Sequence, residues 1–257
     1  MICMAKVDEF LDRVMCGDCR EVMRGWPDAC VDLILTDPPW MISSEVIIHR
    51  SMNPIKYRAK TSIKLDFGSW DHFNNEDEYW DFTRSWLVES TRVLKEKGHL
   101  ITFFDQNKTT PLIKLARRFG LMMRQHLYWL KTNPVPRARK VDFMVALEHA
   151  VWFTKGSKSK ATFNYQLGQQ RNYIEAAIPQ HPRLHPTQKP VEVLEMWVRY
   201  LSNPNDTVLD PLCGSGSTLV AAKKLGRRFI GIDLNENYVE MAKRRLSQVE
   251  RPLEAWA

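Results

Sequence analysis

Residues 37–40 combine an acid, two prolines and a tryptophan directly after the apolar run Val31–Thr36. Proline restricts its own backbone and favours an extended conformation in the residue before it, so the acid is held on a rigid stretch of chain. A carboxylate held in this way can accept hydrogen bonds from an amino group, while the tryptophan can stack on a flat ring. An ordinary Pro-Pro turn would explain the prolines but neither the acid nor the aromatic residue. We therefore predict a catalytic site made of Asp37, Pro38, Pro39 and Trp40.

A second candidate site is the glycine-rich turn between the strand-like run Thr207–Asp210 and a helical pattern that begins at Thr218. Glycine lets a backbone approach a ligand closely because it has no Cβ, and strand–turn–helix units of this kind bind nucleotide-like ligands in α/β proteins. Asp233 ends a further strand-like run roughly 20 residues beyond the turn, where an acid can accept hydrogen bonds from the hydroxyls of a ribose. A turn that serves only as a helix entry would need neither Asp210 nor Asp233.

The residues around this turn discriminate between cofactors. A P-loop requires a lysine after its last glycine, but Ser217 and Thr218 follow Gly216. The dinucleotide fingerprint requires a third glycine, and Leu219 occupies that position. Asp210 adds a carboxylate that suits a ligand with a cationic amino-acid portion. S-adenosylmethionine, which carries an ammonium, a sulfonium and an adenosine, fits such a site better than NAD.

Three motifs together resemble those of one enzyme family. Residues 37–40 resemble the catalytic DPPY/W motif of amino methyltransferases, and Asp210–Thr218 resembles their DPFxGSGTT cofactor motif. His185-Pro186-Thr187-Gln188-Lys189-Pro190 resembles the HPTQKP segment that flanks the cofactor. The order of the three is that of the permuted β-class DNA amino methyltransferases of the N6-adenine/N4-cytosine type. The resemblance covers the chain from about Met15 to Leu246.

The resemblance assigns cofactor contacts to individual residues. Asp18 matches the acid that contacts the adenine of S-adenosylmethionine, and Asp233 matches the acid that binds its ribose. Thr187 and Lys189 match positions near the methionine portion. The expected cofactor-binding residues are Asp18, Thr187, Lys189, Asp210, Pro211, Gly214, Ser215, Gly216, Ser217, Thr218 and Asp233.

The resemblance implies methylation of adenine N6 within a specific duplex DNA sequence, after the target base has left the stack. Asp37 favours adenine because the related cytosine N4 enzymes usually carry serine there. Some of them carry aspartate, so a cytosine N4 methyltransferase remains an alternative. An RNA adenine N6 methyltransferase, which would share the DPPW motif, and a non-catalytic DNA-binding relative are further alternatives. Cytosine C5 chemistry fits poorly, because it uses a Pro-Cys nucleophile and the chain has no Pro-Cys step.

Alternating elements must position these residues. Runs of β-branched and aromatic residues predict strands at Val31–Asp37, His99–Asp105, His126–Lys131, Ala150–Thr154, Thr207–Asp210 and Arg228–Asp233. Helical spacing predicts helices at Glu78–Lys97, Thr110–Phe119, Val191–Leu201, Thr218–Leu225 and Asn237–Val249, with Pro190 as a first helical residue. The alternation predicts an α/β fold with a doubly wound, mostly parallel sheet. With the family resemblance, the expectation is a seven-stranded, Rossmann-like methyltransferase fold over residues 1–257, a single domain with inserted DNA-recognition loops.

Two long stretches interrupt this alternation. Residues 41–67 are basic and carry few apolar side chains after Ile48, and residues 134–180 mix basic and aromatic residues. Loops of this length inside a compact domain are usually functional or disordered, and basic residues interleaved with aromatics suit phosphates and unstacked bases. The first is predicted to contact DNA, and the family resemblance implies that the second recognises the target sequence, although a solvated surface insertion would also explain each lysine alone. The expected DNA-binding residues are Arg50, Lys56, Arg58, Lys131, Asn133, Arg137, Arg139 and Lys140.

The composition and charge of the chain indicate which partner and which cellular location to expect. The chain has 257 residues, 44% of them hydrophobic, and a formal net charge of +7, which raises the expectation of a polyanionic partner such as double-stranded DNA. No apolar run approaches the roughly 18 residues of a membrane span, and the first residues lack a secretory pattern. We therefore expect a cytoplasmic protein without a membrane partner.

Cysteine usage points to no metal and no disulfide framework. The five cysteines are an odd number, and the Cys16–Cys19 pair lacks the two further ligands that a zinc site needs.

The family resemblance leaves open a homodimer and a cognate restriction endonuclease as protein partners.

Overall fold

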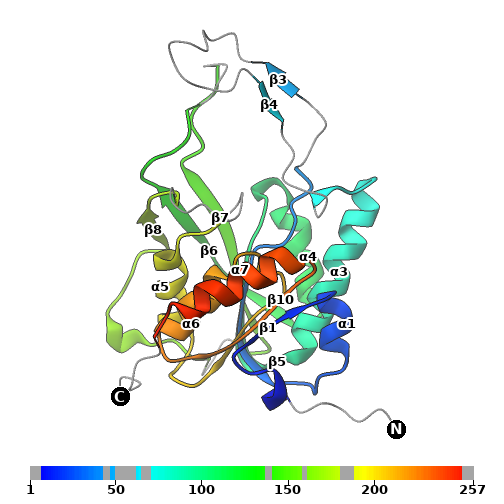
Figure 1. The fold of residues 1–257 in the computed structure, drawn as a ribbon, viewed down its shortest axis with the longest axis vertical. Coiled ribbons are helices and arrows are strands. Elements are labelled where there is room, and N and C mark those ends of the chain that lie inside the picture. Colours follow the sequence, from blue (N-terminus) through cyan, green and yellow to red (C-terminus); the bar gives the residue numbers. More distant parts are fainter. Residues whose placement is uncertain are drawn as a thin grey trace.

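A mixed eight-stranded sheet forms the centre of the described residues, which are 7–42, 47–49, 62–64, 71–136, 141–157, 161–179 and 188–250 of the computed structural model (Figure 1). Its spatial order is β1-β10-β9-β2-β5-β7-β6-β8. The strands are β1 (Arg13–Cys16), β2 (Val31–Thr36), β5 (Leu94–Phe103), β6 (Leu121–Lys131), β7 (Leu147–Lys155), β8 (Tyr173–Ala176), β9 (Thr207–Asp210) and β10 (Arg228–Asp233).

The strand directions confirm the expectation of a mostly parallel sheet. Strands β1, β10, β9, β2 and β5 are mutually parallel, and β7 runs antiparallel to both of its neighbours, β5 and β6. The described sheet has one strand more than expected, because Tyr173–Ala176 of the predicted recognition insertion pairs in parallel with the end of β6. Part of that insertion is therefore an edge of the central sheet.

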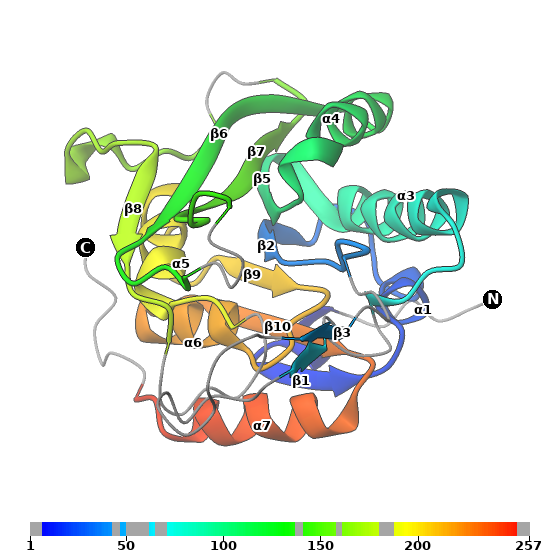
Figure 2. The ribbon, with the colours of Figure 1, turned by 90° about the horizontal axis from the view of Figure 1, so that it is seen from above.

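Helices cover both faces of the sheet, as a doubly wound fold requires. Helices α5, α6 and α7 lie on one side, and α3 and α4 on the other (Figure 2). Each side has its own buried apolar cluster, and α1 joins the second. The helices are α1 (Cys19–Arg24), α3 (Glu76–Val93), α4 (Thr109–Arg118), α5 (Val191–Leu201), α6 (Ser217–Lys224) and α7 (Glu236–Ser247), with short 3-10 turns at η1 (Val7–Phe10), η3 (Gln106–Lys108) and η4 (Tyr165–Leu167).

Most boundaries follow the apolar periodicity, and the exceptions have local causes. The helix expected over Glu78–Lys97 ends at Val93, because Leu94 is already extended and pairs with Val31 of β2. Pro190 is the extended N-cap of α5 rather than its first helical residue. The pair β1 and α1, which the periodicity did not predict, is too short to show a repeat.

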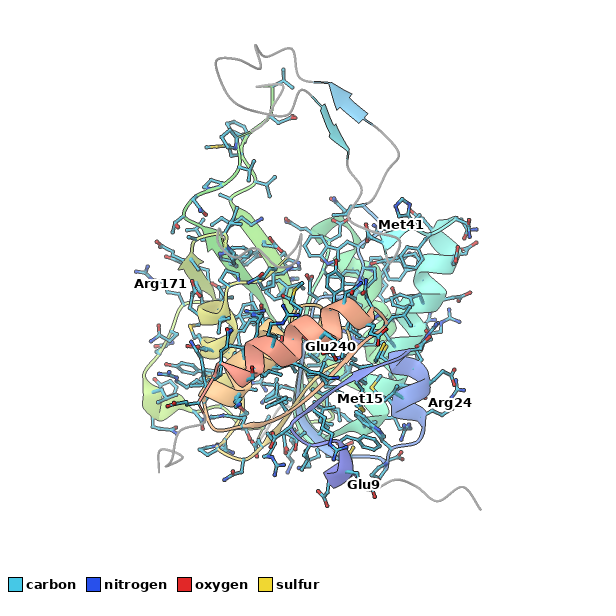
Figure 3. The ribbon with its side chains drawn as sticks, in the orientation of Figure 1. Glu9, Met15, Arg24, Met41, Arg171 and Glu240 are labelled. Atoms are coloured by element: carbon cyan, nitrogen blue, oxygen red, sulfur yellow. The ribbon has the colours of Figure 1, made fainter. Side chains whose placement is uncertain are left out.

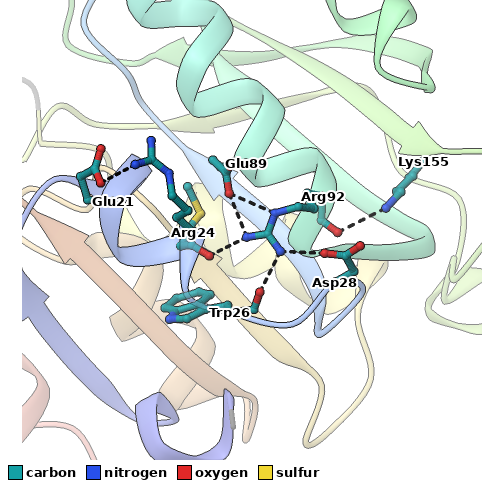
Figure 4. Close-up of polar contacts among 8 residues, drawn as sticks. Glu21, Arg24, Trp26, Asp28, Glu89, Arg92 and Lys155 are labelled. Atoms are coloured by element: carbon teal, nitrogen blue, oxygen red, sulfur yellow. Dashed lines mark hydrogen bonds and ion pairs between the residues drawn. The ribbon is translucent and has the colours of Figure 1, made fainter. Parts of the chain in front are cut away.

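Arg92 at the end of α3 fixes α1 in place (Figure 4). Its guanidinium donates to the carbonyl oxygens of Met23 and Trp26, at 2.6 and 2.8 Å, which are backbone groups at the end of α1. It also pairs with Asp28 and Glu89 at 2.7 and 2.8 Å. Charge-assisted bonds to carbonyls at a helix end satisfy groups that the helix leaves open, so the C-terminal end of α1 is held against α3.

The basic stretch over 41–67 contains a small antiparallel pair, β3 (Ile47–His49) with β4 (Ser62–Lys64). The pair stands apart from the helices that cover the central sheet (Figure 1). Among the described residues, no helix combines the length and apolar character needed to cross a membrane.

Candidate functional site

A cavity of about 500 Å³ opens where four neighbouring parallel strands end. Because β1, β10, β9 and β2 are parallel and adjacent, the residues at their carboxyl ends meet at one edge of the sheet. This edge brings together four acids that lie far apart in sequence. They are Asp18 after β1, Asp37 after β2, Asp210 at the end of β9 and Asp233 at the end of β10, and all four line the cavity.

Most residues expected at the catalytic and cofactor sites form the wall of this cavity. Pro38, Trp40 and Gly216 are not part of the wall, and Thr187 lies outside the described residues. Phe82, Phe103 and other residues that the sequence did not single out complete it. The expected residues in the wall are Asp18, Asp37, Pro39, Lys189, Asp210, Pro211, Gly214, Ser215, Ser217, Thr218 and Asp233.

The glycine turn is held in shape by its own backbone and by Asp233. Gly214 and Gly216 have φ angles of 48° and 77°, in the left-handed region that favours glycine. The Gly214 N–H donates to Oδ2 of Asp233 at 2.8 Å. Thr218, at the start of α6, donates its hydroxyl to the Leu35 carbonyl of β2 at 3.2 Å. The turn is therefore tied to β2, the strand that ends next to Asp37.

Arg245 of α7 is a residue of this site that sequence reasoning missed. Its guanidinium donates to the Ser215 carbonyl and hydroxyl, at 2.6 and 3.1 Å, and to the Ser217 hydroxyl at 3.2 Å. Ser215 and Ser217 were expected to contact the cofactor, but their hydroxyls face this arginine. Only the helix packing places Arg245 here, so no local pattern could have identified it.

Asp210 is a buried carboxylate with a strongly perturbed acidity. Burial raises the pKa of Asp210 to about 7, and the hydroxyls of Thr218 and Thr36 beside it oppose the shift. The charge of Asp37 raises this pKa further, so the two acids are electrostatic neighbours. A ligand cation would stabilise the ionised form of Asp210 and offset its burial.

Asp37 is buried at the end of β2 with one oxygen lacking a hydrogen bond. Burial raises the pKa of Asp37 to about 6, and Lys189 opposes this rise. Oδ2 accepts from the Lys189 ammonium, whereas Oδ1 is buried and accepts no hydrogen bond from any described residue. The Trp40 indole lies close enough to favour the charged form but does not reach hydrogen-bond geometry. Oδ1 is therefore available to a donor from outside the described chain.

A chain of alternating charges runs from Asp37 into the sheet. Lys189 bonds to Asp37 and, at 2.8 Å, to Oε1 of Glu148 on β7. Oε2 of Glu148 pairs with Lys131 at 2.7 Å. The side chains of Lys189 and Glu148 are only 6% and 14% exposed, so both charges depend on their partners. Glu148 was missed by the sequence analysis, although an acid within the apolar strand 147–155 is a signal that could have found it.

Asp18 lies at the start of α1, where its side chain also serves as the helix cap. Oδ1 accepts from the Arg20 backbone N–H at 2.9 Å, and both oxygens accept from the Arg20 guanidinium. The hydrogen bond from Arg20 lowers the pKa of Asp18, against the effect of partial burial. The carboxylate is therefore ionised and fixed in direction at the wall of the cavity.

The described part of the predicted DNA-binding set is engaged within the protein. Lys131 is paired with Glu148 at 2.7 Å, and its side chain is only 15% exposed. Asn133 accepts from the Ile178 N–H at 2.6 Å and so ties the end of β6 to the chain after β8. Trp129, two residues before Lys131, is buried and donates to the Ala176 carbonyl at 2.8 Å. The other predicted residues, Arg50, Lys56, Arg58, Arg137, Arg139 and Lys140, lie outside the described residues.

The donor set of the cavity fits S-adenosylmethionine. Asp210 offers a buried carboxylate for an ammonium, and Asp233 offers a carboxylate at the glycine turn for ribose hydroxyls. The volume lies in the range of small-molecule sites. In the part of the chain that the structure describes, no group of three or more histidine, cysteine or acidic side chains could hold a metal ion.

Comparison with known proteins gives consistent matches along most of the chain. The family model described as DNA methylase matches residues 31–244. The Type II methyltransferase M.HinfI of Haemophilus influenzae is 31% identical over 260 residues, which cover 95% of this chain and 70% of that protein. The Type II methyltransferase M2.LlaDCHI of Lactococcus lactis subsp. cremoris is 30% identical over 230 residues, which cover 85% and 82%.

Solved structures match the fold over nearly the same extent. The complex of M1.HpyAVI with S-adenosylmethionine superposes with a TM-score of 0.70 at 25% identity, covering 91% of this chain and 98% of that one. The cytosine-N4-specific PvuII DNA methyltransferase superposes with a TM-score of 0.71 at 19% identity, covering 94% and 88%. At that identity, the second match bears on the fold alone.

Proposed function

This chain belongs to the DNA methylase family of adenine N6 and cytosine N4 methyltransferases, and we propose that its own target is N6 of adenine. Membership of the family makes it a DNA methyltransferase that uses S-adenosylmethionine. The proposal adds the target atom, the extrusion of the base from a specific duplex sequence, and the roles of individual residues.

The observation that carries the proposal is the unsatisfied Oδ1 of Asp37 at the wall of the cavity. A buried carboxylate oxygen without a donor is costly unless a ligand supplies one. An exocyclic amine has two N–H groups and would supply such a donor. The acid, the cavity and the glycine turn meet at one edge of the sheet, as the chemistry requires.

Two acids suit the cofactor. S-adenosylmethionine, when bound, supplies an electrophilic methyl group on its sulfonium. Asp210 would pair with the ammonium of the amino-acid portion, because a buried carboxylate gains most from a cationic partner. Asp233, held by the Gly214 N–H, would accept the ribose hydroxyls through its remaining lone pairs.

The catalytic motif suits an amine in a flat ring. Trp40 would stack on the extruded base, while Asp37 and the Pro38 carbonyl would accept the two hydrogens of its amino group. Both acceptors would draw the nitrogen lone pair out of conjugation with the ring and raise its nucleophilicity. A carboxylate fixed in a buried site stabilises the developing positive charge on nitrogen more strongly than water does. Lys189 favours the ionised, accepting form of Asp37.

Adenine is preferred over cytosine because the first residue of the catalytic motif is Asp37 rather than serine. The alternative is cytosine N4, since both targets present an exocyclic amine to the same acceptors. We further propose that residues 41–67 contact the DNA backbone and that 134–180 recognise the sequence, on the basis of their basic and aromatic content. Homodimer formation and a cognate endonuclease remain proposals from the family resemblance.

The test is transfer of a labelled methyl group from S-adenosylmethionine to DNA, followed by mass analysis of the released nucleosides. We expect N6-methyldeoxyadenosine with wild-type protein, and a rate loss of at least about 100-fold for Asp37→Ala with cofactor binding retained. Asp81→Ala, which removes an exposed acid on α3, is the matched control and should keep the wild-type rate.

Each alternative gives a different result in this assay. If the product is N4-methyldeoxycytidine, the target is cytosine and not adenine. Transfer to RNA but not to DNA would contradict the DNA assignment, and DNA binding without any transfer would identify a non-catalytic relative. A near-normal rate for Asp37→Ala would refute the role given to that acid.

A further inference from the structure

Asp71 is a buried acid beside the catalytic motif that holds three successive backbone N–H groups. Oδ1 accepts from Trp40 and Met41, each at 2.7 Å, and Oδ2 accepts from Ile42 at 2.8 Å. Asp71 is only 1% exposed, so these backbone N–H groups replace water as the hydrogen-bond donors to its carboxylate. Hydrogen bonds to a charged acceptor are roughly twice as strong as neutral ones.

The backbone around Met41 is shaped to receive an anion. Met41 has a φ of 56°, in the left-handed region that non-glycine residues rarely adopt. A turn that combines right- and left-handed residues points its successive N–H groups into one concavity, which binds anions. Here the anion is Asp71, and a residue keeps such a conformation only when its surroundings hold it.

Lys108 holds the same stretch of backbone through the carbonyl group of Trp40. The Lys108 ammonium donates to the Trp40 carbonyl oxygen, pairs with Asp105 at 3.5 Å, and lies 4.9 Å from the centre of the Tyr79 ring. The N–H and the carbonyl of Trp40 are therefore fixed by two opposite charges. The two charges come from different elements, so the backbone cannot move without breaking one of the contacts.

We propose that Asp71 is a positioning residue for the target-base site, acting through the backbone of Trp40. This inference rests on the proposed function, in which Trp40 stacks on the extruded base. The three hydrogen bonds join residues 29 to 31 positions apart, so one carboxylate fixes both ends of the chain segment that contains the expected DNA-contacting stretch. Met41 lies at the edge of the central fold (Figure 3).

Asp71→Asn tests the proposal with little change in volume. The amide keeps one acceptor oxygen but turns an N–H group towards the N–H of Ile42, so the set of three bonds cannot survive. We expect kcat/KM for DNA to fall by about 10- to 100-fold, because small displacements of positioned groups cost that much. The Kd for S-adenosylmethionine should remain that of wild type, since no cofactor-binding residue is altered.

Amide hydrogen exchange gives a readout that does not depend on catalysis. Exchange in the peptide that contains residues 40–42 should become faster by at least about tenfold in Asp71→Asn, while a peptide from β9 keeps its protection. Asp206→Asn is the matched control, because Asp206 is also an acid that accepts a backbone N–H, from Asn203 at 2.7 Å, but before β9 at the opposite edge of the sheet. It should leave both kcat/KM and the exchange at residues 40–42 unchanged.

The outcomes separate the inference from the function on which it rests. A wild-type kcat/KM in Asp71→Asn, or an equal loss of cofactor affinity, would overturn the positioning role. If Asp71→Asn does not fold, Lys108→Met decides, with a smaller loss of kcat/KM in the same direction expected and a wild-type value contradicting the proposal. If wild-type protein transfers no methyl group to DNA, the proposed function fails, and the exchange at residues 40–42 alone decides whether Asp71 holds the turn.

Discussion

The ammonium of Lys189 bonds directly to the carboxylate of Asp37, across 152 positions of sequence. Lys189 was expected near the methionine portion of the cofactor, and it does line the cavity, but its charge is directed at Asp37. The Lys189 ammonium also pairs with the carboxylate of Glu148, so it has two acidic partners. The ionisation of Asp37 thus depends on residues from two other parts of the chain, Lys189 and Glu148.

The first prediction concerns the pH dependence of the reaction. Burial raises the pKa of Asp37 to about 6, and in the proposed mechanism only the ionised acid stabilises the positive charge that develops on the amine. The value of kcat/KM for DNA should therefore fall as the pH drops through about 6, since this parameter reports the free enzyme. In Lys189→Met, the lost positive charge should move the midpoint to higher pH. Lys243→Met on the exposed face of α7 is the control, and an unmoved midpoint in Lys189→Met would contradict the assignment.

The second prediction is a shift of the opposite sign. The charge of Glu148 raises the pKa of Asp37, so Glu148→Gln should move the midpoint of the same profile to lower pH. The amide preserves the volume but leaves Lys131 and Lys189 with one acidic partner fewer, and breaking a buried pair costs about 3–5 kcal/mol of stability. The profile and a denaturant titration measure the two effects separately. A midpoint that moves upward would show that Glu148 acts only through Lys189.

The third prediction concerns Asp210. Burial raises its pKa to about 7 from an ordinary value of 3.8. Between these values the folded protein binds a proton that the unfolded chain does not bind, so the free energy of unfolding should fall as the pH rises through this range. Asp210→Asn should remove that dependence and be more stable than wild type above pH 7. Thermal unfolding of both proteins across the range checks the sign, and a steeper fall in the variant would contradict it.

Asp210 gives a fourth prediction, for cofactor affinity. If its ionised form binds the ammonium, the Kd for S-adenosylmethionine should rise as the pH drops below about 7. Asp210→Asn should weaken binding by about 10- to 100-fold, as expected for loss of a charge-assisted bond in a buried site. Calorimetric titration at several pH values measures both. Equal affinity of the variant and the wild type would remove Asp210 from the cofactor site.

The fifth prediction concerns the glycine turn. Gly216 has a φ of 77°, and a Cβ there would lie 2.8 Å from the Cβ of Ala242 in α7. Gly216→Ala should lower the free energy of unfolding by about 2–4 kcal/mol, through backbone strain and overpacking. Gly25→Ala is the control, because Gly25 has a φ of −79° and its nearest atom would lie 4.0 Å away. Equal unfolding temperatures for the two variants would contradict the argument.

The sequence by itself determined the elements and the acids at their ends. The bounds of α5, β9 and β10 agree with those read from apolar periodicity, and the strands deliver Asp37, Asp210 and Asp233 as expected. This information is local, because a strand and the polar residue that ends it are neighbours in the chain. Parallel pairing then makes one shared edge from several strand ends, so the site could be anticipated without coordinates.

Only the tertiary structure decided which charges meet. Glu148, Asp71 and Arg245 act on residues 17 to 41 positions away, through sheet pairing and helix packing that no local pattern encodes. The same packing leaves the Lys131 side chain largely buried, where it pairs with Glu148. Hydrogen bonds and ion pairs depend on distances of a few ångströms, and such distances between remote residues are fixed only when the chain folds.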